Sequence, residues 1–131
     1  MPEHPNAALV TRGYQAFSAG DAETLTQPLA SDAVHRVPGS NPLSGDHKGI
    51  ESILGLYGQL AAQSNGTLRV ELLHVMVNDD NRAVAVHRTT AERNGKRLDA
   101  VEALLFTISD GRVTEISDFF PDIEAQDRFW S

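Results

Sequence analysis

The chain of 131 residues contains no cysteine, one tryptophan and two methionines. The absence of cysteine excludes disulfide bonds, thiolate chemistry and cysteine-ligated zinc. No segment approaches the ~20 apolar residues of a membrane-spanning helix, and no run of basic residues is present. Because 18 acidic residues outnumber 11 basic ones, for a net charge of −7, neither nucleic acid nor a membrane is an expected partner.

The remaining composition is that of an ordinary globular protein, with 40% apolar and 22% charged residues. The length and the lack of linkers or repeats predict one domain over residues 1–131. The first ten residues, "MPEHPNAALV", lack the basic start and apolar stretch of a signal peptide. We therefore expect a cytoplasmic protein.

Helical and strand-like patterns occupy separate parts of the sequence. Apolar residues recur at helical spacing over 6–18 and 50–62, a short helix is predicted over 22–28, and a strand over 33–37. Four further runs alternate like strands and are separated by hairpin turn sequences: 67–78, 83–93, 97–108 and 112–120. This order predicts an α+β fold in which a cone-shaped, curved antiparallel sheet packs on three N-terminal helices.

Two further segments are expected to border a pocket inside the cone. The turn-rich segment 38–49 is predicted to be a loop at the pocket entrance. Residues 122–131 carry Ile123, Phe129 and Trp130 as apolar anchors, and are expected to form a short closing helix.

The hairpin turns also predict which residues face each other, because a two-residue turn fixes the register of its strands. The predicted facing pairs are His87 with Glu102, Arg88 with Val101, Thr90 with Asp99, Ala103 with Asp118, and His74 with His87.

Alternation of side chains then divides the strands into two faces, both substantially apolar. The first face includes Arg88, Asp99, Val101, Ala103, Ile116, Asp118 and Phe120. The second face includes Leu72, His74, His87, Glu102, Leu104 and Phe119. One face must cover the helices and the other is expected to contact a second subunit in a homodimer. Apolarity alone does not decide between them.

Several motifs together point to a known superfamily. They are "YQAFSAGD", "SDAVHRVPGSNPLSGDHKG", "AERNGKRLDA", "DGRVTEISDFF" and the closing "DRFW". In this combination the chain resembles the nuclear transport factor 2-like superfamily, and looks closest to SnoaL-like polyketide cyclases and ketosteroid-isomerase-like proteins. The resemblance covers nearly the whole chain. It implies the cone-shaped fold and is poorly specific for the reaction, because one fold hosts many activities.

The isomerase resemblance informs the pocket more than the chemistry. In ketosteroid isomerases the general-base aspartate, oxyanion tyrosine and protonated aspartate correspond to Val37, Gly13 and Ala103 here, so all three groups are missing. The same correspondence implies that Val37, Ala103, Ile116 and Asp118 lie inside. It therefore implies that the first face lines the pocket.

A second branch, the limonene-epoxide-hydrolase-like proteins, uses an aspartate, an arginine and another aspartate. Arg88 and Asp118 match two of these positions. The third position is Thr90, and Asp99 directly opposite could restore the carboxylate.

These arguments give four candidate catalytic residues, each with a structural alternative. Asp118 is the candidate acid or base, because desolvation in an apolar pocket suits a carboxylate to proton transfer. Arg88 is the candidate oxyanion donor, although the two could simply form a structural ion pair. His35 and Asp99 are expected to assist, and a lone histidine on an apolar strand is often only structural.

The remaining site predictions concern binding. The candidate ligand-binding residues are Tyr14, Phe17, Val37, Tyr57, Val101, Ala103, Ile116 and Phe120. A row of His74, His87 and Glu102 could hold a divalent metal, but contact between subunits explains it more simply. No metal and no cofactor is therefore predicted.

The sequence thus favours a cofactor-independent enzyme that acts on a small polyketide-, terpenoid- or steroid-like molecule by acid–base chemistry in an apolar pocket. Isomerisation, cyclisation, dehydration and epoxide hydrolysis all fit. The alternative is a non-catalytic module of the same fold that binds a small molecule or mediates dimerisation.

Overall fold

The computed structural model describes residues 3–131, which form four helices and six strands. The helices are α1 (Pro5–Ala19), α2 (Ala22–Thr26), α3 (Ile50–Gln63) and α4 (Ile123–Trp130). The strands are β1 (Leu29–Val37), β2 (Gly45–Lys48), β3 (Arg69–Val77), β4 (Arg82–Arg93), β5 (Lys96–Ser109) and β6 (Arg112–Phe119). In this part of the chain no helix has the length and apolarity needed to cross a membrane. The segment predicted as a loop over 38–49 is corrected in part, because it contains β2.

Local sequence signals account for where the helices begin and end. Gly20 ends α1 in the left-handed conformation, at φ 69°. The side chains of Asp21 and Asp122 cap α2 and α4, each by accepting a hydrogen bond from the backbone N–H of the third residue of its helix. These signals mark the end of α1 and the beginnings of α2 and α4.

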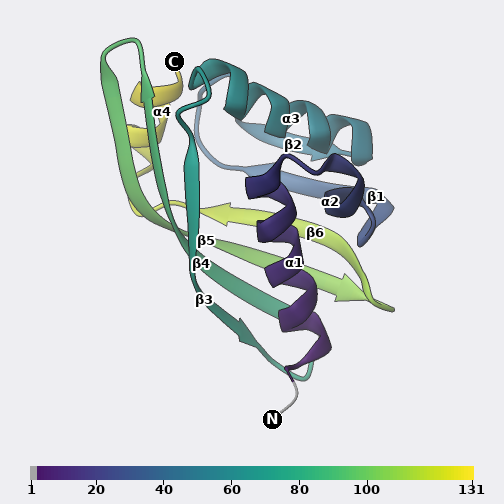
Figure 1. Cartoon of the computed structure of the whole chain (residues 1–131). Helices are drawn as coiled ribbons and strands as arrows, with labels where there is room; N and C mark the ends of the chain where they lie inside the picture. The colour runs from purple at the N-terminus through teal and green to yellow at the C-terminus, as the bar shows by residue number, and fades with distance from the viewer. Residues whose placement is uncertain (1–2) are drawn as a thin grey trace.

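The six strands form one curved sheet in the order β2-β1-β6-β5-β4-β3. All neighbouring pairs are antiparallel except β1 and β6, which are parallel. Figure 1 shows α1, α2 and α3 on one side of this sheet, with the other side of β3, β4 and β5 left uncovered. The predicted α+β architecture, a curved sheet packed on three N-terminal helices, is confirmed.

The register of the β4–β5 hairpin is as predicted, and that of the β5–β6 hairpin is not. His87 faces Glu102 and Arg88 faces Val101 across β4 and β5. A bulge between Thr107 and Ile108 shifts the next pair by one residue, so Asp118 faces Leu104 instead of Ala103. Because side chains alternate, this shift carries Asp118 to the face that holds Glu102.

The β3–β4 register also departs from the prediction. The pairing that starts at the turn, with Val77 opposite Ala83, is one residue off the prediction and places His74 opposite Val86. An irregularity between Leu72 and His74 then shifts the register again and places Leu72 opposite His87. The predicted row of His74, His87 and Glu102 is therefore not assembled, because His74 lies on the opposite face from His87.

The assignment of the first face to the pocket is wrong for β4 and β5. The residues of these strands that turn toward the helices are Ala83, Ala85, His87, Thr89, Glu102, Leu104 and Phe106. Val101 is 51% exposed on the uncovered face, and Ala103 lies beside it. Small residues explain this choice of face, because Ala83 and Ala85 are completely buried and allow α1 to approach the sheet closely.

Helix α4 closes one end of the cone, near the tip of the β4–β5 hairpin (Figure 1). Its Phe129 and Trp130 pack in a buried cluster with Leu43, Leu56 and Leu98. The Asp127 carboxylate oxygen Oδ1 accepts hydrogen bonds from the Ser40 backbone N–H at 2.8 Å and the Asn41 side-chain amide at 2.9 Å. These bonds tie α4 to the segment between β1 and β2.

Gly39 is predicted to be essential to this attachment. A Cβ at Gly39 would clash with Asp127 Oδ1, so Gly39→Ala must push the carboxylate away from both of its donors. Gly45→Ala is a matched control, because its φ of 114° resembles the 100° of Gly39 and no atom lies within 4 Å of the new Cβ. We expect Gly39→Ala to lose ~1–2 kcal/mol more unfolding free energy than Gly45→Ala in denaturant titrations. Equal losses would contradict the role of these bonds.

Candidate active site

A cavity of about 150 Å³ lies between the sheet and helices α1 and α3. Most of its wall is apolar, and its apolar lining includes Leu9, Val10, Phe17, Leu29, Val37, Leu56, Leu60, Leu104, Phe106, Val113, Ile116 and Phe120. A cavity of this volume in another protein is large enough to hold benzene. The enclosed space therefore suits a small ring compound.

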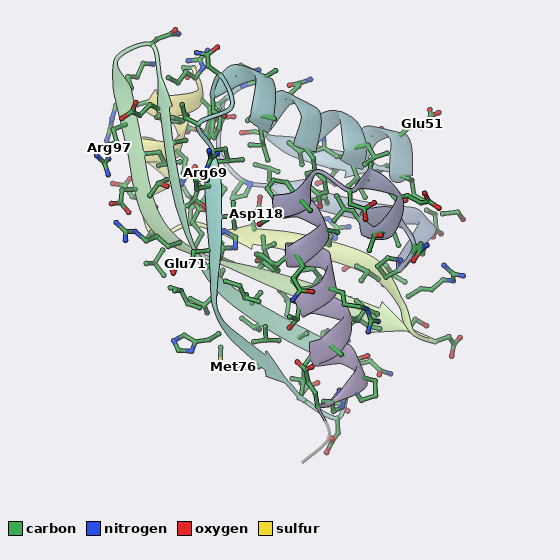
Figure 2. The ribbon with its side chains drawn as sticks, in the orientation of Figure 1. Glu51, Arg69, Glu71, Met76, Arg97 and Asp118 are labelled. Atoms are coloured by element: carbon green, nitrogen blue, oxygen red, sulfur yellow. The ribbon has the colours of Figure 1, made fainter. Side chains whose placement is uncertain are left out.

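One group of polar residues meets this cavity from β1, β6 and α3. His35 is buried on β1, and its Nε2 lies 3.1 Å from Asp118 Oδ1 on β6. Its Nδ1 lies 2.9 Å from the Tyr57 hydroxyl on α3. Parallel pairing of β1 and β6 brings His35 level with Ile116, two residues before Asp118 on the same face. Figure 2 shows Asp118 between the sheet and the helices.

A second group with the same residue types reaches the cavity from α1, β4 and β5. His87 Nδ1 lies 2.6 Å from the Tyr14 hydroxyl, and His87 Nε2 lies 3.0 Å from Glu102 Oε1. Both His87 and Glu102 are buried. The correct β4–β5 register is what places this histidine directly opposite this carboxylate.

Further donors surround Glu102. The Thr89 hydroxyl donates to Oε1 at 2.8 Å, and the Gln126 side-chain amide on α4 donates to Oε2. Trp130 Nε1 in turn donates to Gln126 Oε1 at 3.2 Å. Every oxygen of this buried carboxylate is thus satisfied, as burial of a charge requires.

The two tyrosine hydroxyls are held in the protonated form. Desolvation by burial raises the pKa of Tyr14 far above its usual range, and the negative charge of Asp118 raises it further. The same two causes, in the same order, raise the pKa of Tyr57. These phenols therefore act as hydrogen-bonding groups in the cavity and not as bases.

The structure places most of the predicted site residues at the cavity. Those that line it are Tyr14, Phe17, His35, Val37, Tyr57, Ile116, Asp118 and Phe120. Among the candidate catalytic residues, His35 and Asp118 are brought into direct contact.

Two candidate catalytic residues, Arg88 and Asp99, lie elsewhere, and their predicted place in the pocket is wrong. They form a bidentate ion pair on the uncovered face, with N–O distances of 2.8 and 2.7 Å and side chains 48% and 39% exposed. The hydrogen bond from Arg88 lowers the pKa of the Asp99 carboxyl. The predicted pairing of Arg88 with Asp118 does not form, because the β5–β6 bulge turns Asp118 to the other face. Val101 and Ala103 are also outside, for the reason given above.

The sequence interpretation missed four polar residues of the cavity: His87, Thr89, Glu102 and Gln126. It had paired His87 with Glu102 correctly but placed both on the face between subunits. The missed signal was residue size. Ala83, Ala85 and Ala91 lie on the same face of β4 as His87, at every second position. Small side chains on one face of a strand allow a helix to pack closely against that face.

Comparison with known proteins shows the family of the chain. A family model described as SnoaL-like domain matches residues 10–116. The uncharacterized protein Rv0034 of Mycobacterium tuberculosis (strain ATCC 25618 / H37Rv) is 39% identical over 131 residues, which is 100% of each chain. The structure of Bal32a, from a soil-derived mobile gene cassette, superposes with a TM-score of 0.94 at 42% identity, over 97% of each chain.

A more distant structure supports the fold alone. It is a nuclear transport factor 2-like protein from Burkholderia xenovorans LB400, with a TM-score of 0.82 at 20% identity, covering 100% of this chain and 99% of its own. The predicted fold family is confirmed by these matches.

Tyrosine ionisation provides a test of the buried networks. The chain has only two tyrosines, and both have raised pKa values in the folded state. Their contribution to stability is therefore complete below a pH of about 10, the ordinary tyrosine pKa, and is lost as the pH rises above it. We expect no tyrosinate absorbance until alkaline unfolding, when both phenols ionise together with loss of the circular dichroism signal. Ionisation of either tyrosine near pH ~10 in the folded protein would contradict this arrangement.

Proposed function

Because the chain belongs to the SnoaL-like family, we propose that it is a cofactor-independent enzyme that moves a proton on a small, mostly apolar metabolite. The substrate would be polyketide-, terpenoid- or steroid-like, as the resemblance implies. Asp118 is the proposed acid or base, and His35 the residue that positions it.

The hydrogen bonding of Asp118 carries this proposal. Its Oδ1 accepts from His35 Nε2, and its Oδ2 makes no hydrogen bond with any residue of the described chain. The side chain is only 14% exposed and borders the cavity. A carboxylate with one anchored oxygen and one free oxygen in an apolar space has the geometry that a general base needs.

His35 supports this role through its second nitrogen. When the Tyr57 hydroxyl donates to Nδ1, the ring carries its proton on Nε2 and donates it to Asp118. This fixes the tautomer and directs the Asp118 carboxylate, as a second hydrogen bond to a histidine commonly does.

Isomerisation and cyclisation fit this set of groups better than epoxide hydrolysis. Both need a base, a hydrogen-bond donor to oxygen and a space from which water is excluded. Epoxide hydrolysis by an aspartate–arginine–aspartate set would need Arg88 and Asp99 beside Asp118, and both lie on the other face of the sheet.

Carbon–hydrogen exchange provides a test that does not require the natural substrate. We expect the wild-type protein to accelerate deuterium exchange at the enolisable carbon of 2-tetralone in D₂O, followed by NMR. Asp118→Asn should lower this rate about 10²- to 10⁴-fold, the usual contribution of a general base. Asp99→Asn is the matched control, because it makes the same chemical change on the uncovered face and should keep the wild-type rate.

Equal exchange rates in the wild type and Asp118→Asn would rule out the proposed base. If 2-tetralone quenches the fluorescence of Trp130, which lines the cavity, and no exchange occurs, the result favours the alternative, a non-catalytic binding module. The most direct guide to the natural ligand is mass spectrometry of small molecules that remain bound through purification.

The uncovered sheet face supports a further part of the proposal, a homodimer. Large apolar side chains are exposed on this face and on the adjoining α4: Leu73, Met76, Val101, Phe119 and Ile123. Figure 2 shows Met76 and Glu71 on the side of the sheet that faces away from the helices. Arg88 and Asp99 neutralise each other there, so an identical copy meets little repulsion although the chain carries a net charge of −7. Exposed apolar patches of this kind commonly mark subunit contacts.

A charge placed in this patch is expected to separate the subunits. Val101→Lys would bury an unpaired ammonium at the contact, which is costly enough to dissociate a dimer. Gln59→Lys on the exposed side of α3 adds the same charge away from the patch. We expect sedimentation equilibrium to show a dimer for the wild type and Gln59→Lys, and a monomer for Val101→Lys. A monomeric wild type would refute the dimer.

A further inference from the structure

Glycine occurs in two kinds of position along the chain. Seven of the ten glycines have positive φ angles, a backbone conformation that favours glycine because it has no Cβ. The other three, Gly13, Gly55 and Gly58, lie inside the helices α1 and α3. Glycine inside a helix is less stable than alanine, so these three positions need another explanation.

The two glycines of α3 differ from the one of α1 in what surrounds them. Gly55 and Gly58 are exposed, and neither lines the cavity. Gly13 is half-buried and lines the cavity. A functional reason for a glycine is therefore to be sought at Gly13.

Gly13 lies on the inward face of α1. It follows Leu9 by four residues and precedes Phe17 by four, and residues at this spacing share one face of a helix. Leu9 and Phe17 both line the cavity. A side chain at position 13 would therefore project between them, from α1 toward the sheet (Figure 1).

Close packing does not require a glycine at this position. A helix that touches another element through a glycine leaves no room for a Cβ, as happens between Gly39 and Asp127. At Gly13, apart from the chain neighbours and the helix backbone, no atom lies within 4 Å of an added Cβ. A methyl group would fit there without strain, in space that the protein leaves open.

The chain thus gives up stability twice at one position. A glycine lowers the stability of α1, and the open space in front of it lacks the contacts that a side chain would make. Natural sequences depart from the most stable choice mainly where function requires it. Since the open space belongs to the cavity, a bound ligand accounts for both losses.

We propose that Gly13 is a specificity-determining residue. An apolar part of the ligand lies against the α1 backbone at Gly13, and the missing side chain sets the upper limit on the size of the ligand. This inference rests on the part of the proposed function that makes the cavity a ligand site, and it does not depend on proton transfer by Asp118.

Two phenols that differ by one fused ring test this size limit. 6-Fluoro-2-naphthol is the larger ligand and 4-fluorophenol the smaller, and both carry one hydroxyl group and one fluorine. Titrations followed by ¹⁹F NMR give the two affinities for each protein. The variants are Gly13→Ala and Gly13→Leu. Gly58→Ala and Gly58→Leu are the matched controls, because they make the same changes inside a helix and away from the cavity.

We expect the wild type to bind the larger ligand more tightly. Gly13→Ala should weaken binding of 6-fluoro-2-naphthol about 10-fold, the lower end of the range for one methylene group in an apolar pocket, and leave 4-fluorophenol unaffected. Gly13→Leu should abolish binding of 6-fluoro-2-naphthol. Both Gly58 variants should keep the two wild-type affinities.

Stability separates this role from a merely structural one. Alanine is the better helix former, so Gly13→Ala and Gly58→Ala should each raise the melting temperature by about 3–5 °C. Gly13→Ala is then more stable than the wild type and still binds the larger ligand less well. A lower melting temperature of Gly13→Ala would show that packing requires the glycine, and would overturn the inference.

A direct measurement does not depend on any variant remaining folded. With ¹³C-labelled glycine in the wild type, we expect a nuclear Overhauser effect between the Gly13 Hα protons and the ring protons of bound 6-fluoro-2-naphthol. Its absence would overturn the inference. So would a wild type that prefers 4-fluorophenol or binds neither compound, or an equal loss of both ligands in Gly13→Ala.

The two proposals fail in different ways. If the Gly13 variants change the size preference and the wild type catalyses no carbon exchange, the enzymatic function is wrong and the role of Gly13 stands. If the wild type exchanges deuterium and Gly13→Ala keeps both affinities, only the present inference is wrong.

Discussion

A carboxylate inside an apolar cavity must be matched by hydrogen-bond donors, and this requirement organises the interior of the protein. Each of the two carboxylates that line the cavity lies beside a histidine of the neighbouring strand. Each histidine in turn contacts a tyrosine from a helix, so the pairing of strands and the placement of α1 and α3 serve the same two groups. The curvature of the sheet matters because it directs both groups into one space. Stability and chemistry therefore depend on the same contacts.

The unequal number of donors separates the two groups by role. Three donors occupy both oxygens of Glu102, whereas Asp118 retains an oxygen that no described residue binds. Similar side chains in one cavity can in this way take opposite parts in a proton transfer, since environment more than residue type sets the behaviour of a carboxylate. The outer Arg88–Asp99 pair shows the contrasting case, in which two charges meet in solvent and contribute little beyond local order.

Much of the fold could be predicted from the sequence, and the site only in part. Helical periodicity, alternating strand-like runs and hairpin turn sequences predicted the observed elements and the correct β4–β5 register. The bulges at Thr107/Ile108 and Leu72/His74 carry no residue that marks them, and each reverses which side of a strand faces inward. One such reversal brought Asp118 to the face of the sheet that holds His87 and Glu102, and left Arg88 on the other face. Because both faces of the sheet are apolar, the alternation of apolar residues along the strands does not reveal which face turns inward.

Helix α4 links the cavity to the exterior through Gln126, whose amide bonds to Glu102, and through Asp127, whose carboxylate holds the segment between β1 and β2. A ligand that enters by displacing α4 must separate a buried anion from one of its donors before it gains any contact of its own. This cost raises the free-energy barrier to ligand entry and exit, and it does not change the free energy of the bound complex. For the proposed enzyme, residence times inside the cone would then be long compared with the proton transfer, and the release of product would limit the rate of turnover.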